Sequence, residues 1–569
     1  MSNEPSPSSD RQAGMHLTRH FVTVGNRRVH YSRIGSGPVV VLLHASPCSF
    51  KVLEQPQRVF ARYFTALAFD TPGFGLSDLL PMAQPETEDF ADALAETLDA
   101  LGIDQVAVHG RHTGAQVAVE FAARHPMRCS FALTDGFPVF EESVRLSRPG
   151  SYLKPIEASW EGAHLLWMWF RYREQHVFWP WNAQDQAHRA DTDVPGVDFI
   201  HRGVIELLEA GDGYRIGYAT AYRHRGLAAL ADLKVPVCFG WRPGDSLFTN
   251  RLRMPDSAWS VEIPREADAA ANAELQLLLK HPPMGGTPPA ALSCSELPGR
   301  TTLDYVTVGA SQVLVRRSGV TGAGRSPFVL IHPLPGSSLL LDELVVELAR
   351  QSDREVIAFD LPGHGESLAR SGNDQSVEAL AQAALDTLDA LGIVACHLVG
   401  RQGGATVAVA ALAPGRVLEL TLDSPVALPA AQRAHMIDEW FKPLGDFLPR
   451  WDGQHLVQAW HMRRDMALWW PWHDRRRECA RAGVPNISPD RLTFEIRESM
   501  KQAASFAPVL RAVMGWPLPE RLSALKGPIR LLVRANDPWA PCAEALQASG
   551  FEVTEVADEA AAIAQRLSA

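Results

Sequence analysis

The sequence predicts an α/β protein of two tandem domains, each a mostly parallel, doubly wound sheet covered by an aromatic-rich helical cap. Three observations predict this. Short apolar runs alternate with helical patterns, the pattern occurs twice along 569 residues, and a stretch rich in Pro and Gly separates the copies. Each copy is long enough to bury a core of its own.

Within the first copy, apolar β-branched runs predict buried parallel strands, and helical spacing of apolar residues that ends in Gly predicts a helix between them. We expect strands at 38–44, 65–70, 105–110, 131–135 and 235–241, and a helix at 89–102. An aromatic region of helical pattern is inserted before the last of these strands.

Three motifs reveal the duplication. ALAFDTPGFGLS at 66–77 returns as VIAFDLPGHGES at 356–367, ETLDALGI at 96–103 returns as DTLDALGI at 386–393, and FWPW returns as WWPW. We therefore expect a disordered lead-in at 1–15, a domain at 16–280 with its cap at about 141–230, a linker at 281–302, and a domain at 303–569 with its cap at about 430–520.

Composition excludes several classes of function. The net charge of −11 provides no positive excess to bind nucleic acid or an anionic membrane surface. Seven scattered cysteines without a C-x-x-C pair indicate neither a disulfide framework nor a zinc site, so we expect no metal and no cofactor. Because a secretory signal and a long apolar run are both missing, we expect a cytoplasmic protein that does not span a membrane.

The order of motifs resembles the α/β-hydrolase superfamily. In the first copy an apolar strand ends in HASP at 44–47, then comes DTPGFGLS at 70–77, then a strand leading into GRHTG at 110–114. The second copy has HPLPG at 332–336, DLPGHGES at 360–367 and GRQGG at 400–404. The resemblance covers nearly the whole chain. It implies the fold and says almost nothing about the substrate.

The resemblance implies that the central residue of each Gly-x-x-x-Gly turn occupies the family's nucleophile position. That residue is His112 in the first copy and Gln402 in the second. Neither has the hydroxyl, thiol or carboxylate that forms the family's usual covalent intermediate. An imidazole can act as a base or proton shuttle near neutral pH, whereas an amide cannot. We therefore expect the first copy to be catalytic and the second to be non-catalytic.

Two aspartates can pair with His112, and the sequence leaves both open. Asp135 ends the next predicted strand, and Asp245 follows a later one. Their equivalents in the second copy are Asp423 and Asp537. Neither domain has a histidine beyond its later aspartate, so neither can complete the family's triad.

The resemblance also implies an oxyanion hole made of backbone N–H groups. In the first copy these belong to the loop of His44 and Ala45 and to Thr113, and in the second copy to the loop of His332 and to Gly403. The alternative for His44 is that its ring only braces the loop.

Further candidates lie beside the turns and in the caps. Arg111 and Arg401 can bind a carboxylate or be ion-paired within the protein. The cap residues that we select are His164, Trp169, His176 and Trp179 in the first copy and His455 in the second. Aromatic residues at helical spacing also suit a helix-packing role. If they form a roof, they predict an apolar or aromatic small molecule as the ligand.

These features together predict an enzyme that hydrolyses a small apolar or aromatic molecule, with His112 as base or proton shuttle. Two alternatives stay open. One is cofactor-free lyase or decarboxylase-type cleavage at the same site, and the other is a non-catalytic ligand-binding or interaction protein. The oligomeric state is open as well, and the duplication is compatible with a monomer whose copies form an internal pseudo-dimer.

Overall fold

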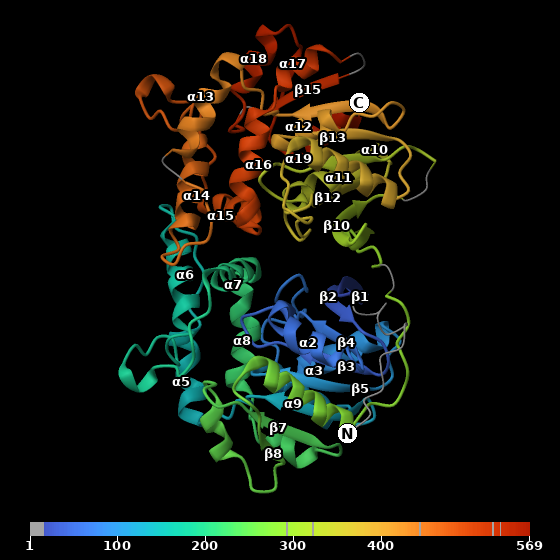
Figure 1. Ribbon diagram of the computed structural model, residues 1–569, viewed down its shortest axis with the longest axis vertical. Helices are drawn as coiled ribbons and strands as arrows, with labels where there is room; N and C mark the ends of the chain where they lie inside the picture. Colours follow the sequence, from blue (N-terminus) through green and yellow to red (C-terminus); the bar gives the residue numbers. More distant parts are fainter. Residues whose placement is uncertain are drawn as a thin grey trace. The chain divides into compact units, whose positions relative to one another are not determined.

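The computed structural model describes residues 16–291, 294–320, 324–442, 445–525, 529–534 and 536–568. The chain divides into two compact units (Figure 1). The first comprises the residues up to Glu157 together with Met168–Ser295, and the second comprises Ala158–Trp167 together with Glu296–Ala569. The lead-in expected at 1–15 lies outside the described residues.

An eight-stranded sheet forms the centre of the first unit, in the order β1-β2-β4-β3-β5-β6-β7-β8. The strands are β1 (Thr18–Val24), β2 (Arg27–Ile34), β3 (Val39–Leu43), β4 (Thr65–Phe69), β5 (Val106–Arg111), β6 (Cys129–Asp135), β7 (Val237–Trp241) and β8 (Ser260–Glu262). Strand β2 pairs antiparallel with β1 and β4, and the other neighbours are parallel. The five strands expected from the sequence correspond to β3 to β7.

Helices cover both faces of this sheet and also form the insertion between β6 and β7. They are α2 (Glu54–Phe60), α3 (Thr87–Ala100), α4 (Thr113–Arg124), α5 (Glu142–Tyr152), α6 (Ala163–Glu174), α7 (Val197–Ala210), α8 (Tyr214–Arg223) and α9 (Ala267–Lys280). Phe90 of α3 and Phe121 of α4 belong to the core on one face. Phe60 of α2 and Leu278 of α9 belong to the core on the other face. The sheet is therefore buried on both sides, as its apolar strands require.

The second unit repeats the strand order as β9-β10-β12-β11-β13-β14-β15-β16. The strands are β9 (Thr302–Val308), β10 (Ser311–Ser318), β11 (Phe328–Ile331), β12 (Val356–Phe359), β13 (Cys396–Arg401), β14 (Val417–Asp423), β15 (Ile529–Arg534) and β16 (Val553–Val556). Again the first two strand pairings are antiparallel and the rest are parallel.

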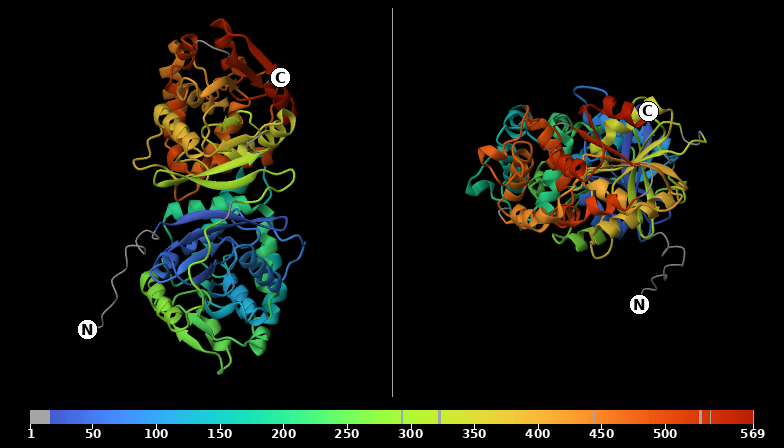
Figure 2. Two further views of the ribbon diagram at one scale, coloured as in Figure 1. Left: turned by 90° about the vertical axis from the view of Figure 1, so that its right-hand side faces the viewer. Right: turned by 90° about the horizontal axis from the view of Figure 1, so that it is seen from above.

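The helices of the second unit follow the same plan, with their insertion between β14 and β15. They are α10 (Asp342–Ser352), α11 (Val377–Ala390), α12 (Gly403–Ala410), α13 (Ala430–Phe441), α14 (Gln454–Met466), α15 (Pro489–Met500), α16 (Ala503–Gly515), α17 (Leu518–Ser523), α18 (Cys542–Ala548) and α19 (Ala560–Ser568). The last helix, α19, packs against α10 near the C-terminus (Figure 2). Two equivalent sheets of mostly parallel strands confirm the fold class that the sequence predicts. In the part of the chain that is described, no helix combines the length and apolar character needed to cross a bilayer.

Candidate active site

A strained turn joins β5 to α4 and presents His112. Its backbone has φ 50° and ψ −111°, a region that non-glycine residues rarely occupy. Glycine is required on both sides of the turn. A Cβ on Gly110 would lie 2.2 Å from the carbonyl oxygen of Gly114, and a Cβ on Gly114 would lie 2.3 Å from that of Leu43. In the second unit Gln402 has the matching φ 50° and ψ −120°.

His112 is hydrogen-bonded to Asp245. The Nε2 atom of His112 lies 3.0 Å from Oδ1 and 2.9 Å from Oδ2 of Asp245. Burial alone would raise the pKa of Asp245, but the neighbouring His112 and Arg111 and the amide of Leu247 outweigh burial and hold that pKa well below its usual range. Because the ionised carboxylate can only accept hydrogen bonds, Nε2 of His112 carries the proton. Among the described residues, none donates a hydrogen bond to Nδ1 of His112, and the His112 side chain is 24% exposed.

Asp135, the other aspartate considered for His112, is engaged elsewhere. Its Oδ2 accepts a 2.7 Å hydrogen bond from Arg242, and Arg111 lies 3.6 Å away. Asp135 meets His112 through its backbone, since its carbonyl oxygen accepts from the N–H of His112 at 3.2 Å. The structure therefore brings His112 together with Asp245, and Asp135 together with two arginines.

The loop after β3 is braced by the His44 ring. Its Nδ1–H donates to the carbonyl of Ala45 at 2.9 Å, and its Nε2 accepts from the N–H of Thr71 at 3.0 Å. Burial lowers the pKa of His44, so the ring is neutral. In the second unit His332 makes the same contacts, with Pro333 and Leu361. Thr113 is the first residue of α4, so its amide has no acceptor within the helix and is available to an oxyanion.

Two aromatic residues of the cap are placed near this turn. Burial, and then the charges of Arg111 and Arg171, lower the pKa of His176 to about 4. The ring of His176 packs 5.6 Å from the ring of Tyr172, whose hydroxyl lies 3.9 Å from the Sγ of Cys48. Burial raises the pKa of Cys48 to about 12, so this thiol is not an activated nucleophile.

The remaining cap candidates lie elsewhere. Trp169 is buried, and the ring of Trp179 packs against Tyr152. His164 lies in the segment assigned to the second unit, where its Nε2 is 2.9 Å from the hydroxyl of Thr493. His455 is buried in α14, and its Nδ1 accepts from the amide of Arg450 at 3.2 Å. His164 donates from Nε2 to Thr493, because its Nδ1 accepts from the amide of Ser159, and His455 accepts; these hydrogen bonds suit a structural role.

In the second unit an amide takes the place of the imidazole. The Nε2 of Gln402 donates to Oδ2 of Asp537 at 2.7 Å, and both side chains are buried. Asp423 accepts three hydrogen bonds from the guanidinium of Arg534, two from Nε and one from Nη2. The pattern of the first unit is thus repeated without a group that can exchange a proton.

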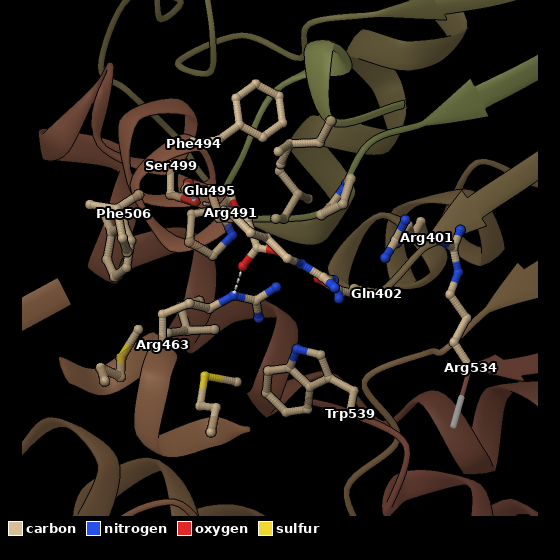
Figure 3. A pocket seen from close by; sticks show the side chains of 18 of the residues that line it. Arg401, Gln402, Arg463, Arg491, Phe494, Glu495, Ser499, Phe506, Arg534 and Trp539 are labelled. Atoms are coloured by element: carbon tan, nitrogen blue, oxygen red, sulfur yellow. Dashed lines mark hydrogen bonds and ion pairs between the residues drawn. The ribbon is translucent and has the colours of Figure 1, made fainter. Parts of the chain in front are cut away.

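A cavity of about 300 Å³ opens beside Gln402 (Figure 3). Gly403, which follows Gln402, begins α12. The lining combines charged and apolar side chains, including Arg401, Arg463, Arg491, Glu495, Phe494, Phe506, Arg534, Trp539 and Asp558. By contrast, a cavity of about 30 Å³ in the first unit is lined in part by Asp70 and Thr71, and its lining does not include His112.

Sequence patterns alone did not identify several residues around both turns. Arg242 pairs with Asp135, and Gly136, with φ +74°, lies directly against the His112 ring. Both stand beside the ends of predicted strands, so proximity to β6 and β7 is the signal that could have found them. Arg463 and Glu495 come from separate cap helices, and no local pattern relates them. In the described part of the chain, no group of three His, Cys, Asp or Glu side chains is placed to hold a metal ion.

Comparison with known proteins shows a similarity to one family over part of the chain. Residues 326–456 match the family model described as "alpha/beta hydrolase fold". The second unit therefore contains a segment similar to α/β-hydrolase-fold proteins. A relative is the soluble epoxide hydrolase of Corynebacterium sp. (strain C12), 35% identical over 106 residues, which are 19% of this chain and 37% of that protein.

Two further similarities are with the dihydrolipoyllysine-residue acetyltransferase component of the acetoin cleaving system of Pseudomonas putida and with a solved structure. The first is 39% identical over 117 residues, 20% of this chain and 31% of that protein. The second is epoxide hydrolase A from Mycobacterium thermoresistibile, with 15% identity and a TM-score of 0.37, covering 47% of this chain and 98% of that one. The chain spans about a third of the length of the curated relatives it matches.

Proposed function

We propose that the first unit hydrolyses a small apolar or aromatic organic molecule, with His112 as general base and Asp245 as the group that orients it. The observation that carries the proposal is the hydrogen bond from Nε2–H of His112 to a buried, ionised carboxylate. This bond leaves Nδ1 as the proton acceptor of a partly exposed ring.

In the proposed reaction, Nδ1 of His112 takes a proton from water while the water oxygen bonds to an electrophilic carbon of the substrate. Asp245 stabilises the resulting imidazolium, which then returns the proton to the leaving group. The N–H of Thr113 donates to the developing negative oxygen. No covalent intermediate forms, because His112 occupies the position of the nucleophile and acts through water.

The substrate class follows from the side chains near the turn. The neutral, partly exposed ring of His176 packs on the buried Tyr172 and supplies aromatic surface there, and Cys48 is a neutral thiol. We rank hydrolysis ahead of lyase-type cleavage because similar proteins are named as hydrolases, among them the 2-(acetamidomethylene)succinate hydrolase of Mesorhizobium japonicum.

The test is a turnover screen of aromatic esters and epoxides in water labelled with ¹⁸O. Hydrolysis places one label in the product, whereas lyase chemistry places none. His112→Gln, which copies the second unit, is expected to lower kcat/KM roughly 10²- to 10⁴-fold. His125→Ala is the matched control, since His125 pairs with Asp92 at 2.8 Å at the other end of α4. Full activity of the His112→Gln variant would refute the proposal.

A second candidate is a ligand-binding protein without catalytic activity. It is favoured by the position of the 300 Å³ cavity, which adjoins an amide that cannot exchange protons. Ligand binding without turnover across the whole screen would support this candidate over the first.

A further inference from the structure

We propose that the cavity of the second unit binds a small organic carboxylate, with Arg401 as the residue that pairs with the ligand's negative charge. The cavity lies wholly among residues of the second unit. The proposal is therefore independent of whether His112 of the first unit is catalytic.

Arg401 lies within ion-pair distance of two aspartates but makes no hydrogen bond with either. Its Nε lies 3.9 Å from Asp423, and its Nη2 lies 3.5 Å from Asp537, which are both too long for a good hydrogen bond. Among the described residues, Nε of Arg401 is buried without a hydrogen-bond partner, and only 14% of the side chain is exposed. Burial, and then the charge of Arg534, lower the pKa of Arg401, although three nearby aspartates act in the opposite direction.

The two aspartates near Arg401 are already engaged. Arg534 donates to both oxygens of Asp423. Asp537 accepts from Gln402 at 2.7 Å and from the amide of Trp539 at 2.9 Å. Since closer donors hold these carboxylates, Arg401 makes no hydrogen bond with either of them.

The other charges that line the cavity compensate one another. Glu495 accepts from Arg463 at 2.5 Å and from Arg491 at 3.0 Å, and these arginines lower its pKa to about 2 although burial would raise it. Asp558 pairs with Arg491 and Arg534 at 3.2 Å and 3.1 Å. Figure 3 shows the bonded pair of Arg463 and Glu495 apart from Arg401.

Glu343 also lines the cavity, but it is exposed to solvent, so its charge is screened. An entering carboxylate would find in Arg401 a planar donor group suited to bidentate pairing. An inorganic anion would satisfy that charge equally well, so the organic part of the ligand needs its own evidence.

That evidence is the apolar part of the lining. It is made of aromatic and flexible aliphatic side chains, namely Leu334, Met462, Met466, Phe494, Phe506 and Trp539. Trp539 is held in place by stacking on Trp440, with ring centroids 5.2 Å apart. A volume of about 300 Å³ is at the lower end for ligand pockets. Charge and shape together indicate a small carboxylate with an aromatic or aliphatic body.

Calorimetric titration of the full chain with benzoate and with its neutral analogue benzamide tests the proposal. We expect the wild-type chain to bind benzoate at least about tenfold more tightly than benzamide, because only benzoate pairs with the guanidinium. Arg401→Gln should abolish this preference, and Arg401→Lys should retain part of it. Arg111→Gln, the matched change in the first unit, should leave the preference intact.

Each of four results would overturn the proposal. They are equal binding or no binding of the two probes by the wild-type chain, an unchanged preference in Arg401→Gln, loss of the preference in Arg111→Gln, and displacement of benzoate by an equal concentration of inorganic phosphate. Circular dichroism of each variant establishes that it is folded. If Arg401→Gln does not fold, the Lys variant and the wild-type comparison decide the outcome.

Discussion

Gln402 donates a 2.7 Å hydrogen bond to Asp537, and both side chains are buried. Replacing Gln402 by Ala should lower the free energy of unfolding of the second unit by about 1–3 kcal/mol, because a buried carboxylate loses its donor. Replacing it by Glu should cost more, because two carboxylates would then face each other in a buried site.

Urea unfolding of both variants measures these changes. Gln454→Ala serves as the control, since that side chain is exposed at the start of α14 and should change stability by less than about 0.5 kcal/mol. Wild-type stability of Gln402→Ala would contradict a structural role for this bond.

The second prediction concerns a buried glutamate in each unit. Ser49 donates to Glu206 at 2.8 Å, and Ser337 donates to Glu498 at 2.5 Å. Burial raises the pKa of Glu206 from 4.5 to about 6. Burial acts in the same direction on Glu498, but Lys501 and Arg497 outweigh it and lower the pKa of Glu498.

The two glutamates should therefore affect stability in opposite directions. The raised pKa of Glu206 stabilises the fold fully below pH 4.5, and this contribution is lost as the pH rises through about 6. The wild-type chain should lose about 2 kcal/mol relative to Glu206→Gln between pH 4.5 and 7. Glu498→Gln should instead destabilise at pH 7, because the lowered pKa of Glu498 stabilises above 4.5. Parallel pH profiles for wild type and Glu206→Gln would contradict the assignment.

The third prediction concerns Gly136, which lies against the catalytic candidate. A Cβ at this position would lie 2.9 Å from Cδ2 of His112 and 3.3 Å from Oδ1 of Asp245, at a φ of +74°. Gly136→Ala should therefore push the ring away from Asp245 and cost about 1–3 kcal/mol.

Nitrogen-15 NMR of the His112 ring would report loss of the Nε2–H hydrogen bond, and urea unfolding would report the cost. Gly150→Ala is the control, because nothing lies within 4 Å of a Cβ there. An unchanged ring signal in Gly136→Ala would show that the turn adapts without moving His112.

The fourth prediction separates a brace from a catalytic group. Removing the His44 ring leaves the N–H of Thr71 and the carbonyl of Ala45 without partners, so His44→Ala should cost about 1–3 kcal/mol. Activity measured on the folded fraction should stay close to that of the wild-type chain. A large loss of kcat in folded protein would instead give His44 a direct part in the reaction. His188→Ala is the control for stability, since this histidine is partly exposed and its partner Asp185 is exposed to solvent.

Much of the site could be predicted from local sequence. The Gly-x-x-x-Gly pattern places His112 and Gln402 on their turns, because only glycine fits at the flanking positions. Local sequence could not predict whether His112 pairs with Asp135 or with Asp245. The choice depends on a hydrogen bond from Arg242 to Asp135, which forms only in the folded chain. The roles of the predicted site residues stay predictions. The hydrogen-bond partner of His164 could not be predicted from local sequence, because Thr493 is distant in the sequence.

By itself the sequence determined the duplication, the predicted strands along the chain and the residue on each turn, because these depend on periodicity and on short motifs. Only the tertiary structure decided which carboxylate each residue meets, and that a cavity of about 300 Å³ adjoins Gln402. The physical reason is competition. A buried carboxylate pairs with whichever donors from distant segments approach it most closely, and a donor left without a hydrogen bond, such as Nε of Arg401, becomes available to a ligand.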